Sequence, residues 1–284
     1  MAVRDVSHVE LYTRDKIATV DFFVSTMGFT RVADSVAVDR SSVLLRQGDA
    51  QLVVTSGWGT GEWLSKYGDG VADIAVTCDD VAETARAALA AGARVMRSPH
   101  GAPVVSRWGA VSHTLLPASL TDSITPPVGH KWRVFPGAPE EPTGHLRRYD
   151  HIAIRLEENL LNDYAAFCTE VFGLSLVPGR RPPVGGQAVA PLVAHSASKR
   201  VAFVLTSADT YDGAEALTAR LENPEGAVGT HRLAFLADGV RFGTREHRHP
   251  GMPQLRLHTV EHGGRQGIGT ALSGFAAGTG GSVG

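Results

Sequence analysis

The chain has 284 residues, with 27 Lys and Arg against 29 Asp and Glu, and a formal net charge of −2. This balance excludes a strongly basic surface for nucleic acid or for an anionic membrane. There are 32 Gly and 15 Pro residues, which favour many turns between short strands over a helical bundle. The start of the chain has no basic stretch followed by an apolar one, and no apolar run reaches membrane-spanning length. We therefore expect a soluble, cytoplasmic protein with no membrane partner.

The two cysteines, Cys78 and Cys168, lie far apart in apolar segments. Buried free thiols in a reducing compartment are the favoured interpretation over a disulfide.

The first part of the chain alternates strand and helix patterns. "SHVELYT" (7–13) has the alternation of a half-buried strand, and "DKIATVDFFVSTMGF" (15–29) has apolar residues at helical spacing up to Gly28. Three strand-like runs follow, separated by turn residues: "TRVADSVAV", "RSSVLLRQGD" and "AQLVVTSG".

The same order then returns. "GVADIAVTCDD" (70–80) predicts a strand, "VAETARAALAAGA" (81–93) an Ala-rich helix, and "RVMRSPH" and "GAVSHTLLPA" two more strands. The first 125 residues thus read as two β-α-β-β(-β) units, which predicts an N-terminal domain over 1–125.

A stretch rich in Pro, Gly and charge, residues 126–148, predicts a linker across the surface. The pattern then restarts with the strand "YDHIAIRL" (149–156) and the amphipathic helix "LLNDYAAFCTEVFGL" (160–174). We expect a second, pseudo-duplicated domain over 149–284.

Several segments in order resemble a known family. They are "SHVELYTRD", "RSSVLLRQGDAQLVVTSG", "YGDGVADIAVTCDDV", "FPGAP", "YDHIAI", "LENPEGAVGTHRLAFLADGV" and "VEHGGRQGIGTALSGF". Together they resemble the 4-hydroxyphenylpyruvate dioxygenase and hydroxymandelate synthase family of the vicinal oxygen chelate superfamily. The resemblance implies an α+β fold of two tandem vicinal-oxygen-chelate domains, each an open barrel of paired β-α-β-β-β modules, and it implies a homodimer.

The family's C-terminal barrel holds ferrous iron with two His and one Glu, a facial triad that leaves positions open for a 2-oxo acid and dioxygen. The first ligand position matches His151. At the second, an ungapped match places Arg232, with His231 one residue earlier. Because strand side chains alternate faces, Arg232 pointing into the barrel turns His231 out of it, and a bulge would exchange the two. We favour Arg232 as the residue that faces the cavity.

The third ligand position also departs from the family pattern, because His258 stands where the Glu belongs. Glu261 lies an odd number of residues away and is expected on the other face, while His262 shares the face of His258 near the strand end. Fe(II) held by His151 and His258, with His231 as a further candidate, is one expectation. No metal is the alternative.

Two more departures concern the cavity. Only thirteen residues, 241–253, separate "HRLAFLADGV" from "QLRLHTVEH", which is too short for a helix with further strands and predicts a shortened last module. Thr206 and Ser207 replace an Asn-Glu-Pro run of the family, so their hydroxyls are the candidate substrate-binding groups beside Arg232.

Each candidate also has an ordinary structural interpretation. His151 can be a core histidine, Arg232 a surface charge, and His258 a member of a polar outer face with Arg256. The "REHRHPG" segment (245–251) reads as a solvated loop. His8 and Asp73 occupy the equivalent positions of the N-terminal half, and we expect no metal there.

Two functions remain open. The first is an enzyme with His151, Arg232 and His258 as catalytic residues, acting on a small aromatic or amino-acid-derived acid by iron-dependent oxidation or by metal-free isomerisation or cyclisation. The second is a metal-free module that binds and sequesters a small molecule. We favour the enzyme, since a decayed site would more simply carry small apolar residues.

Overall fold

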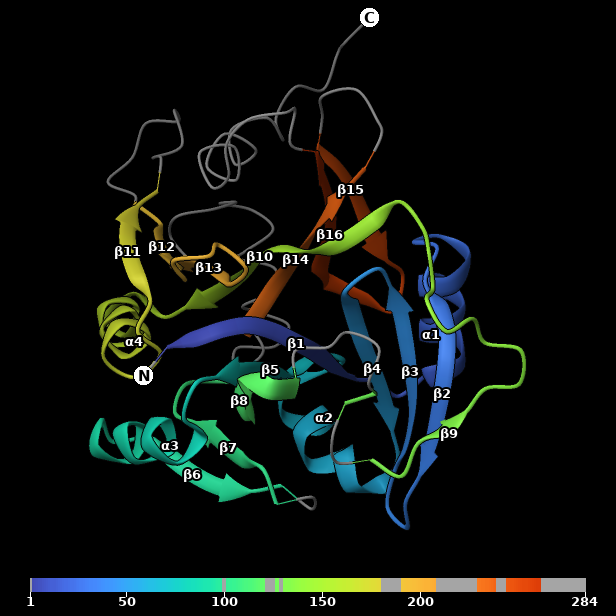
Figure 1. The fold of residues 1–284 in the computed structure, drawn as a ribbon, viewed down its shortest axis with the longest axis horizontal. Coiled ribbons are helices and arrows are strands. Elements are labelled where there is room, and N and C mark those ends of the chain that lie inside the picture. The colour runs from blue at the N-terminus through green and yellow to red at the C-terminus, as the bar shows by residue number, and fades with distance from the viewer. Residues whose placement is uncertain are drawn as a thin grey trace, which may run out of the picture.

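The computed structural model describes residues 2–98, 101–120, 126–127, 130–179, 190–207, 229–238 and 244–261. They form two mixed β-sheets with a few helices (Figure 1). The sheet of the N-terminal half has the strand order β6-β7-β8-β5-β1-β4-β3-β2-β9, and that of the C-terminal half has the order β11-β12-β13-β10-β14-β16-β15. Neither sheet closes on itself among these residues, so both are open barrels.

The N-terminal sheet consists of two modules joined by antiparallel pairing of their first strands, β1 and β5. The first module is β1 (Val3–Tyr12), α1 (Lys16–Ser25), β2 (Thr30–Val36), β3 (Ser41–Gln47) and β4 (Ala50–Ser56). The second is β5 (Gly70–Cys78), α3 (Val81–Ala90), β6 (Arg94–Arg97), β7 (Pro103–Ser106) and β8 (Ser112–Pro117). A short helix, α2 (Gly61–Tyr67), connects them. The predicted β-α-β-β-β repeat is confirmed.

Side-chain caps fix where α1 and α3 begin. Asp15 Oδ1 accepts a hydrogen bond from the Ala18 backbone N–H at the start of α1, and Asp80 Oδ1 accepts one from Glu83 at the start of α3. Such caps satisfy donors that the helix itself leaves unpaired. The helices predicted at 15–29 and 81–93 are confirmed, with ends at Ser25 and Ala90.

The C-terminal sheet has one full module and one shortened module. The full module is β10 (Leu146–Leu156), α4 (Glu158–Glu170), β11 (Ser175–Pro178), β12 (Leu192–His195) and β13 (Ala202–Ser207). The last contains β14 (Gly229–Ala237), β15 (Thr244–His249) and β16 (Met252–Glu261). Within the described ranges no helix belongs to it and no strand lies beyond β15, whereas β2 occupies the corresponding place in the first module. The shortened last module is therefore confirmed.

One local prediction is wrong. The "REHRHPG" segment is not a solvated loop, because Thr244–His249 forms β15 and pairs with β16 from Val260 to Met252. Its charged side chains suit an edge strand, where one row of backbone groups stays unpaired and charge discourages further pairing.

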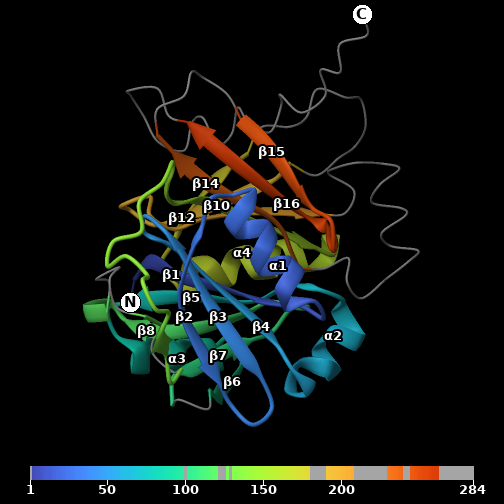
Figure 2. The same cartoon turned by 90° about the vertical axis from the view of Figure 1, so that its right-hand side faces the viewer.

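The two sheets share one hydrophobic core, which also includes the inner sides of α1, α3 and α4. Strand β10 contacts β3 and β4, while β14 and β16 contact β5, so the halves pack directly on each other (Figures 1 and 2). The rings of Phe29 and Phe235 meet across this boundary with centroids 5.6 Å apart. The tip of the β15–β16 hairpin also reaches the N-terminal half, where His249 packs on Phe22 of α1.

Cys78 and Cys168 are buried and free, as predicted. In the region expected to be a linker, β9 (Arg133–Val134) pairs with β2, and β10 already begins at Leu146. No helix in the described part of the chain is long and apolar enough to cross a membrane.

The β3–β4 turn fixes the start of β10 by close backbone contact. Gly48 has φ +54° and donates its N–H to Pro142 O, while the Gln47 side chain accepts the Leu146 N–H at 2.6 Å. A Cβ on Gly48 would lie 2.5 Å from Arg147 O and 2.7 Å from Leu146 O.

We predict that Gly48→Ala lowers the free energy of unfolding by about 1–3 kcal/mol, because the left-handed φ and the carbonyl contacts both oppose a Cβ. Gly61→Ala is the matched control, since a Cβ there meets nothing within 4 Å and lies at the first residue of α2. Gly61→Ala should leave the free energy of unfolding unchanged or raise it by up to about 1 kcal/mol. Urea unfolding measures both, and equal effects of the two substitutions would contradict the prediction.

Candidate functional site

The candidate residues His151 and His258 lie in one row across the C-terminal sheet. His151 of β10 stands opposite Ala234 of β14, and Ala234 stands opposite His258 of β16. Residues opposite each other in a sheet point to the same face, so both imidazoles share one face with a small alanine between them. Their side chains are buried, with 5% and 8% of His151 and His258 exposed.

The opposite face of the same strands is apolar. Ile152, Leu233 and Leu257 alternate with the row residues and belong to the core shared by the two halves. The core therefore fixes the direction of the histidine row, because a strand that buries one set of side chains turns the other set outward.

Arg232 lies on the histidine face, two residues before Ala234. It stands opposite Ala153 on one side and Arg256 on the other, and it is 5% exposed. Arg248 of β15 stands opposite Arg256, so a second row with three arginines runs beside the histidine row.

Carboxylates neighbour both imidazoles. His151 Nδ1 lies 2.8 Å from Asp150 Oδ2, and His258 Nε2 lies 3.4 Å from Glu246 Oε2 on the adjacent β15. Glu246 Oε1 in turn accepts a hydrogen bond of 2.8 Å from Arg248 Nε. Such contacts orient a ring and select which nitrogen carries the proton.

The pKa of His258 is lowered from 6.5 to about 3, first by burial and then by the positive groups Arg232, His151 and Arg256. A buried imidazole that gains a proton would join a cluster of cations, so the neutral form is favoured at neutral pH. The interpretation of His258 as part of an exposed outer face is therefore not supported.

The two hydroxyl candidates do not share a face. Thr206 stands opposite Arg155 of β10, two residues beyond Ala153, and so lies on the histidine face. Ser207 stands opposite Leu156, a core residue, on the other face. Alternation along β13 separates the two side chains.

Three further candidates lie wholly or partly outside the described residues. The backbones of His231 and Glu261 belong to β14 and β16, but their side chains lie outside the description. His262 and the "GIGTALSGF" segment are also outside it.

Sequence reasoning missed Glu246 and Arg248 because it placed them in a loop. The signal available was the alternation of "TREHRH" itself, which puts Glu246 and Arg248 on one side once the segment is taken as a strand.

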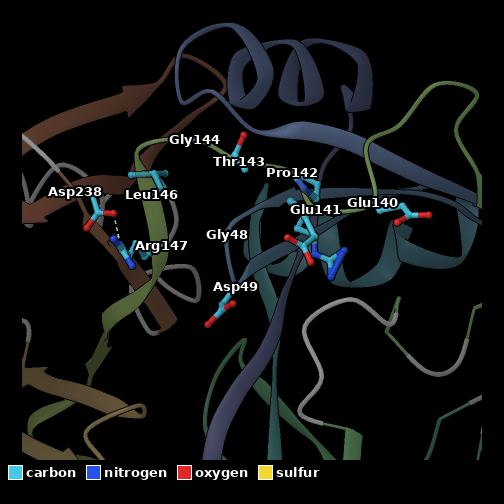
Figure 3. A pocket seen from close by; sticks show the side chains of 11 residues that line it. Gly48, Asp49, Glu140, Glu141, Pro142, Thr143, Gly144, Leu146, Arg147 and Asp238 are labelled. Atoms are coloured by element: carbon cyan, nitrogen blue, oxygen red, sulfur yellow. Dashed lines mark hydrogen bonds and ion pairs between the residues drawn. The ribbon is translucent and has the colours of Figure 1, made fainter.

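A pocket of about 430 Å³ lies away from this face, between the β3–β4 turn and the start of β10 (Figure 3). It is lined by Arg46, Gly48, Asp49, Glu140, Glu141, Pro142, Thr143, Gly144, Leu146, Arg147 and Asp238. Its charges are of both signs, and Arg147 pairs with Asp238 at one edge of it. None of the candidate residues lines this pocket, and we assign it to the joint between the two halves.

The ferrous ion that the resemblance implies does not fit the described donor set. By the resemblance, Arg232 and His258 stand where the second His and the Glu are expected, so a permanent cation takes the place of one neutral ligand and an imidazole that of the carboxylate. Among the residues that can be described, no group of three or more His, Cys, Asp or Glu is arranged to hold a metal ion.

Known proteins share this fold and parts of this sequence. Residues 5–134 match the family model of the Glyoxalase/Bleomycin resistance protein/Dioxygenase superfamily. A 4-hydroxyphenylpyruvate dioxygenase from Yarrowia lipolytica is 28% identical over 134 residues, which span 40% of this chain and 34% of that protein. The chain resembles 4-hydroxyphenylpyruvate dioxygenase and 4-hydroxymandelate synthase. The curated relative is matched over only about a third of its length.

Solved structures extend the likeness to nearly the whole chain. A triple mutant of 4-hydroxymandelate synthase from Streptomyces coelicolor has a TM-score of 0.80 at 23% identity and covers 96% of this chain and 97% of its own. A xylose isomerase-like TIM barrel/4-hydroxyphenylpyruvate dioxygenase fusion protein has a TM-score of 0.70 at 16% identity, covering 95% of this chain and 51% of its own. At these identities the likeness establishes the fold alone, while the site must be argued from this chain's own residues.

We predict that His258 makes the protein sensitive to acid. Its pKa is depressed in the folded state, so its contribution is complete above the unfolded value of 6.5 and is lost as the pH falls toward about 3. Over this window the free energy of unfolding should fall by roughly 1 kcal/mol per pH unit from this group alone. Urea unfolding between pH 7 and pH 5 measures the slope.

His258→Gln should reduce that slope by roughly 1 kcal/mol per pH unit, because glutamine takes up no proton in the unfolded chain. The control His145→Gln removes an exposed histidine and should leave the wild-type slope in place. Parallel slopes for wild type and His258→Gln would show that His258 is not the group responsible.

Proposed function

We propose that the C-terminal sheet carries the active site of a diverged enzyme, similar to 4-hydroxyphenylpyruvate dioxygenase, that acts on a small aromatic or amino-acid-derived acid without the two-histidine-one-glutamate iron site. The observation that supports this most is that His151, Arg232 and His258, from three neighbouring strands, lie on one face and are all at least nine-tenths buried. Buried ionisable groups that share one small region are costly to fold, and they concentrate at functional sites.

Arg232 binds the carboxylate of the substrate in this proposal. Its guanidinium is buried beside Arg256, and the planar fork of arginine matches a carboxylate with two parallel hydrogen bonds. An anion bound there offsets the positive charge of the arginine row, which supports an acid over a neutral or cationic substrate.

His258 is the proton acceptor. The substrate's carboxylate offsets the charges of Arg232 and Arg256 that depress the pKa of His258, and so raises that pKa toward the working range. Glu246 beside Nε2 favours the proton on that nitrogen, which leaves Nδ1 as the acceptor.

The reaction class is proton transfer next to a carbonyl. His258 takes a proton from the carbon beside the oxo group, the C–H electron pair becomes the enolate, and the proton returns to oxygen or to another carbon, which is an isomerisation. His151 hydrogen-bonds to Asp150 through Nδ1, so its Nε2 can accept the hydrogen bond of the enol hydroxyl. Thr206, on the same face, is the hydroxyl placed to contact the substrate.

A second candidate function is a metal-free protein that binds the same acid without converting it. The shortened last module favours it, since β15 is the last strand in its direction among the described residues and no further strand encloses the face. Both functions predict that the acid binds, but only the enzyme predicts proton transfer. The homodimer and the cytoplasmic location that the sequence suggested stay predictions.

We predict that Arg232→Gln weakens the binding of 4-hydroxyphenylpyruvate by at least about tenfold, because a charge-assisted pair contributes at least about 1.4 kcal/mol. Arg232→Lys keeps the charge and should recover part of the affinity. The matched control is Arg245→Gln, which removes an exposed arginine next to Glu246 on the opposite face of β15. Isothermal titration with folding checked by circular dichroism measures all three, and unchanged affinity in Arg232→Gln contradicts the proposal.

Deuterium exchange at the carbon beside the oxo group then tests the chemistry. Wild type should accelerate the exchange in heavy water above the buffer rate, and His258→Gln should lose the acceleration. Binding without acceleration would favour the second candidate.

Metal content after anaerobic addition of Fe(II) tests whether iron binds at His151. Stoichiometric iron in the wild type that is lost in His151→Ala would overturn the metal-free proposal.

A further inference from the structure

The N-terminal sheet repeats the backbone positions of the candidate site with different side chains. His8 of β1 stands opposite Ala75 of β5, and Glu10 stands opposite Asp73, just as His151 stands opposite Ala234 and Ala153 opposite Arg232. The alternate residues of β1 and β5, among them Val9 and Ile74, belong to the shared core, so His8, Glu10 and Asp73 lie on the other face.

Two carboxylates therefore stand directly opposite each other on this face. Glu10 Oε1 accepts a hydrogen bond of 2.6 Å from Thr55 Oγ1, and Asp73 Oδ1 accepts one of 2.6 Å from Ser112 Oγ. Asp73 is only 7% exposed. Burial, with Glu10 adding to it, raises the pKa of Asp73 to about 7. Like charges held this close in a buried place are unfavourable without a compensating cation.

Gln51 gives an independent sign of a missing partner. Val9 of β1 pairs with Leu52 of β4, which places Gln51 beside His8, on the same face as Thr55. Gln51 is 5% exposed, and its Oε1 is a buried oxygen with no hydrogen-bond partner among the described residues. An orphan buried acceptor costs about 1–3 kcal/mol, a cost that a donor from a ligand would remove.

The face is apolar next to the carboxylates. Val53 lies beside Glu10 and packs with Leu44 and Ala33 in a cluster of its own, against which Trp132 of the segment before β9 also packs. Arg40, whose positive charge lowers the pKa of Glu10, also pairs with Asp39 at 2.9 Å, so its charge is shared between two carboxylates. An organic cation fits these surroundings better than a metal, for which the described side chains offer no ligand cluster.

We propose that the N-terminal half carries a second ligand site, in which Glu10 and Asp73 bind the ammonium group of a small aryl- or alkylamine, Gln51 accepts a further hydrogen bond, and Val53, Leu44 and Trp132 contact its apolar part. The ligand's positive charge separates this site from the arginine-rich face of the C-terminal half, which selects for anions.

Three probes that differ at one group test the proposal on the full-length protein. Tyramine carries an ammonium group, tyrosol replaces it with a hydroxyl, and 4-hydroxyphenylacetate replaces it with a carboxylate. We expect saturable one-to-one binding of tyramine by isothermal titration, binding of tyrosol weaker by at least about tenfold, and no binding of the anion in the Arg232→Gln background. This comparison needs no substitution in the N-terminal face, so it decides the charge preference even where a variant folds poorly.

Asp73→Asn locates the site, and it should weaken tyramine binding by at least about tenfold. Asp21→Asn, which removes an exposed carboxylate on α1, is the matched control and should change nothing. Arg232→Gln should leave tyramine binding intact, which keeps this test separate from that of the proposed function. No saturable binding of tyramine, equal binding of tyrosol, or full affinity in Asp73→Asn would each overturn the second site.

Discussion

The apolar core between the two sheets is the constraint on which the rest of the molecule depends. It takes one face of β1, β5, β10, β14 and β16 and leaves their alternate side chains on the other face. Every polar row described here follows from this choice. Moving β10, β14 or β16 by one residue would bury histidine or arginine in this core and expose isoleucine or leucine, at a cost of several kcal/mol per strand.

The duplicated fold thus presents two similar faces with different charged residues. The C-terminal face has arginines in register beside two histidines, and the N-terminal face has paired carboxylates beside one histidine. Backbone pairing is nearly the same in both halves, so the difference comes from single positions such as Arg232 and Asp73. A duplicated scaffold that keeps its core can vary its outward-facing residues. One scaffold can therefore carry two chemistries.

The shortened last module brings a carboxylate to the histidine row. Strand β15 lies next to β16 and places Glu246 Oε2 3.4 Å from His258 Nε2. The hairpin is fixed at its tip, where His249 packs on Phe22 and Gln254 donates a hydrogen bond to Asp69 O. These contacts with the N-terminal half support the β15–β16 hairpin, whose strand β15 forms one edge of the C-terminal sheet.

The sequence by itself determined the modules, the helices, the free cysteines, the shortened end, and His151, Arg232 and His258 as candidate residues. These depend on local periodicity, turn residues and ordered motifs, which a single chain displays directly. Only the tertiary structure decided that "REHRHPG" pairs as a strand, that Thr206 and Ser207 part to opposite faces, and that Gln51 lies beside His8. Register between strands far apart in the chain is set by which side chains the common core can accept, and that information belongs to the packed pair of sheets rather than to any segment.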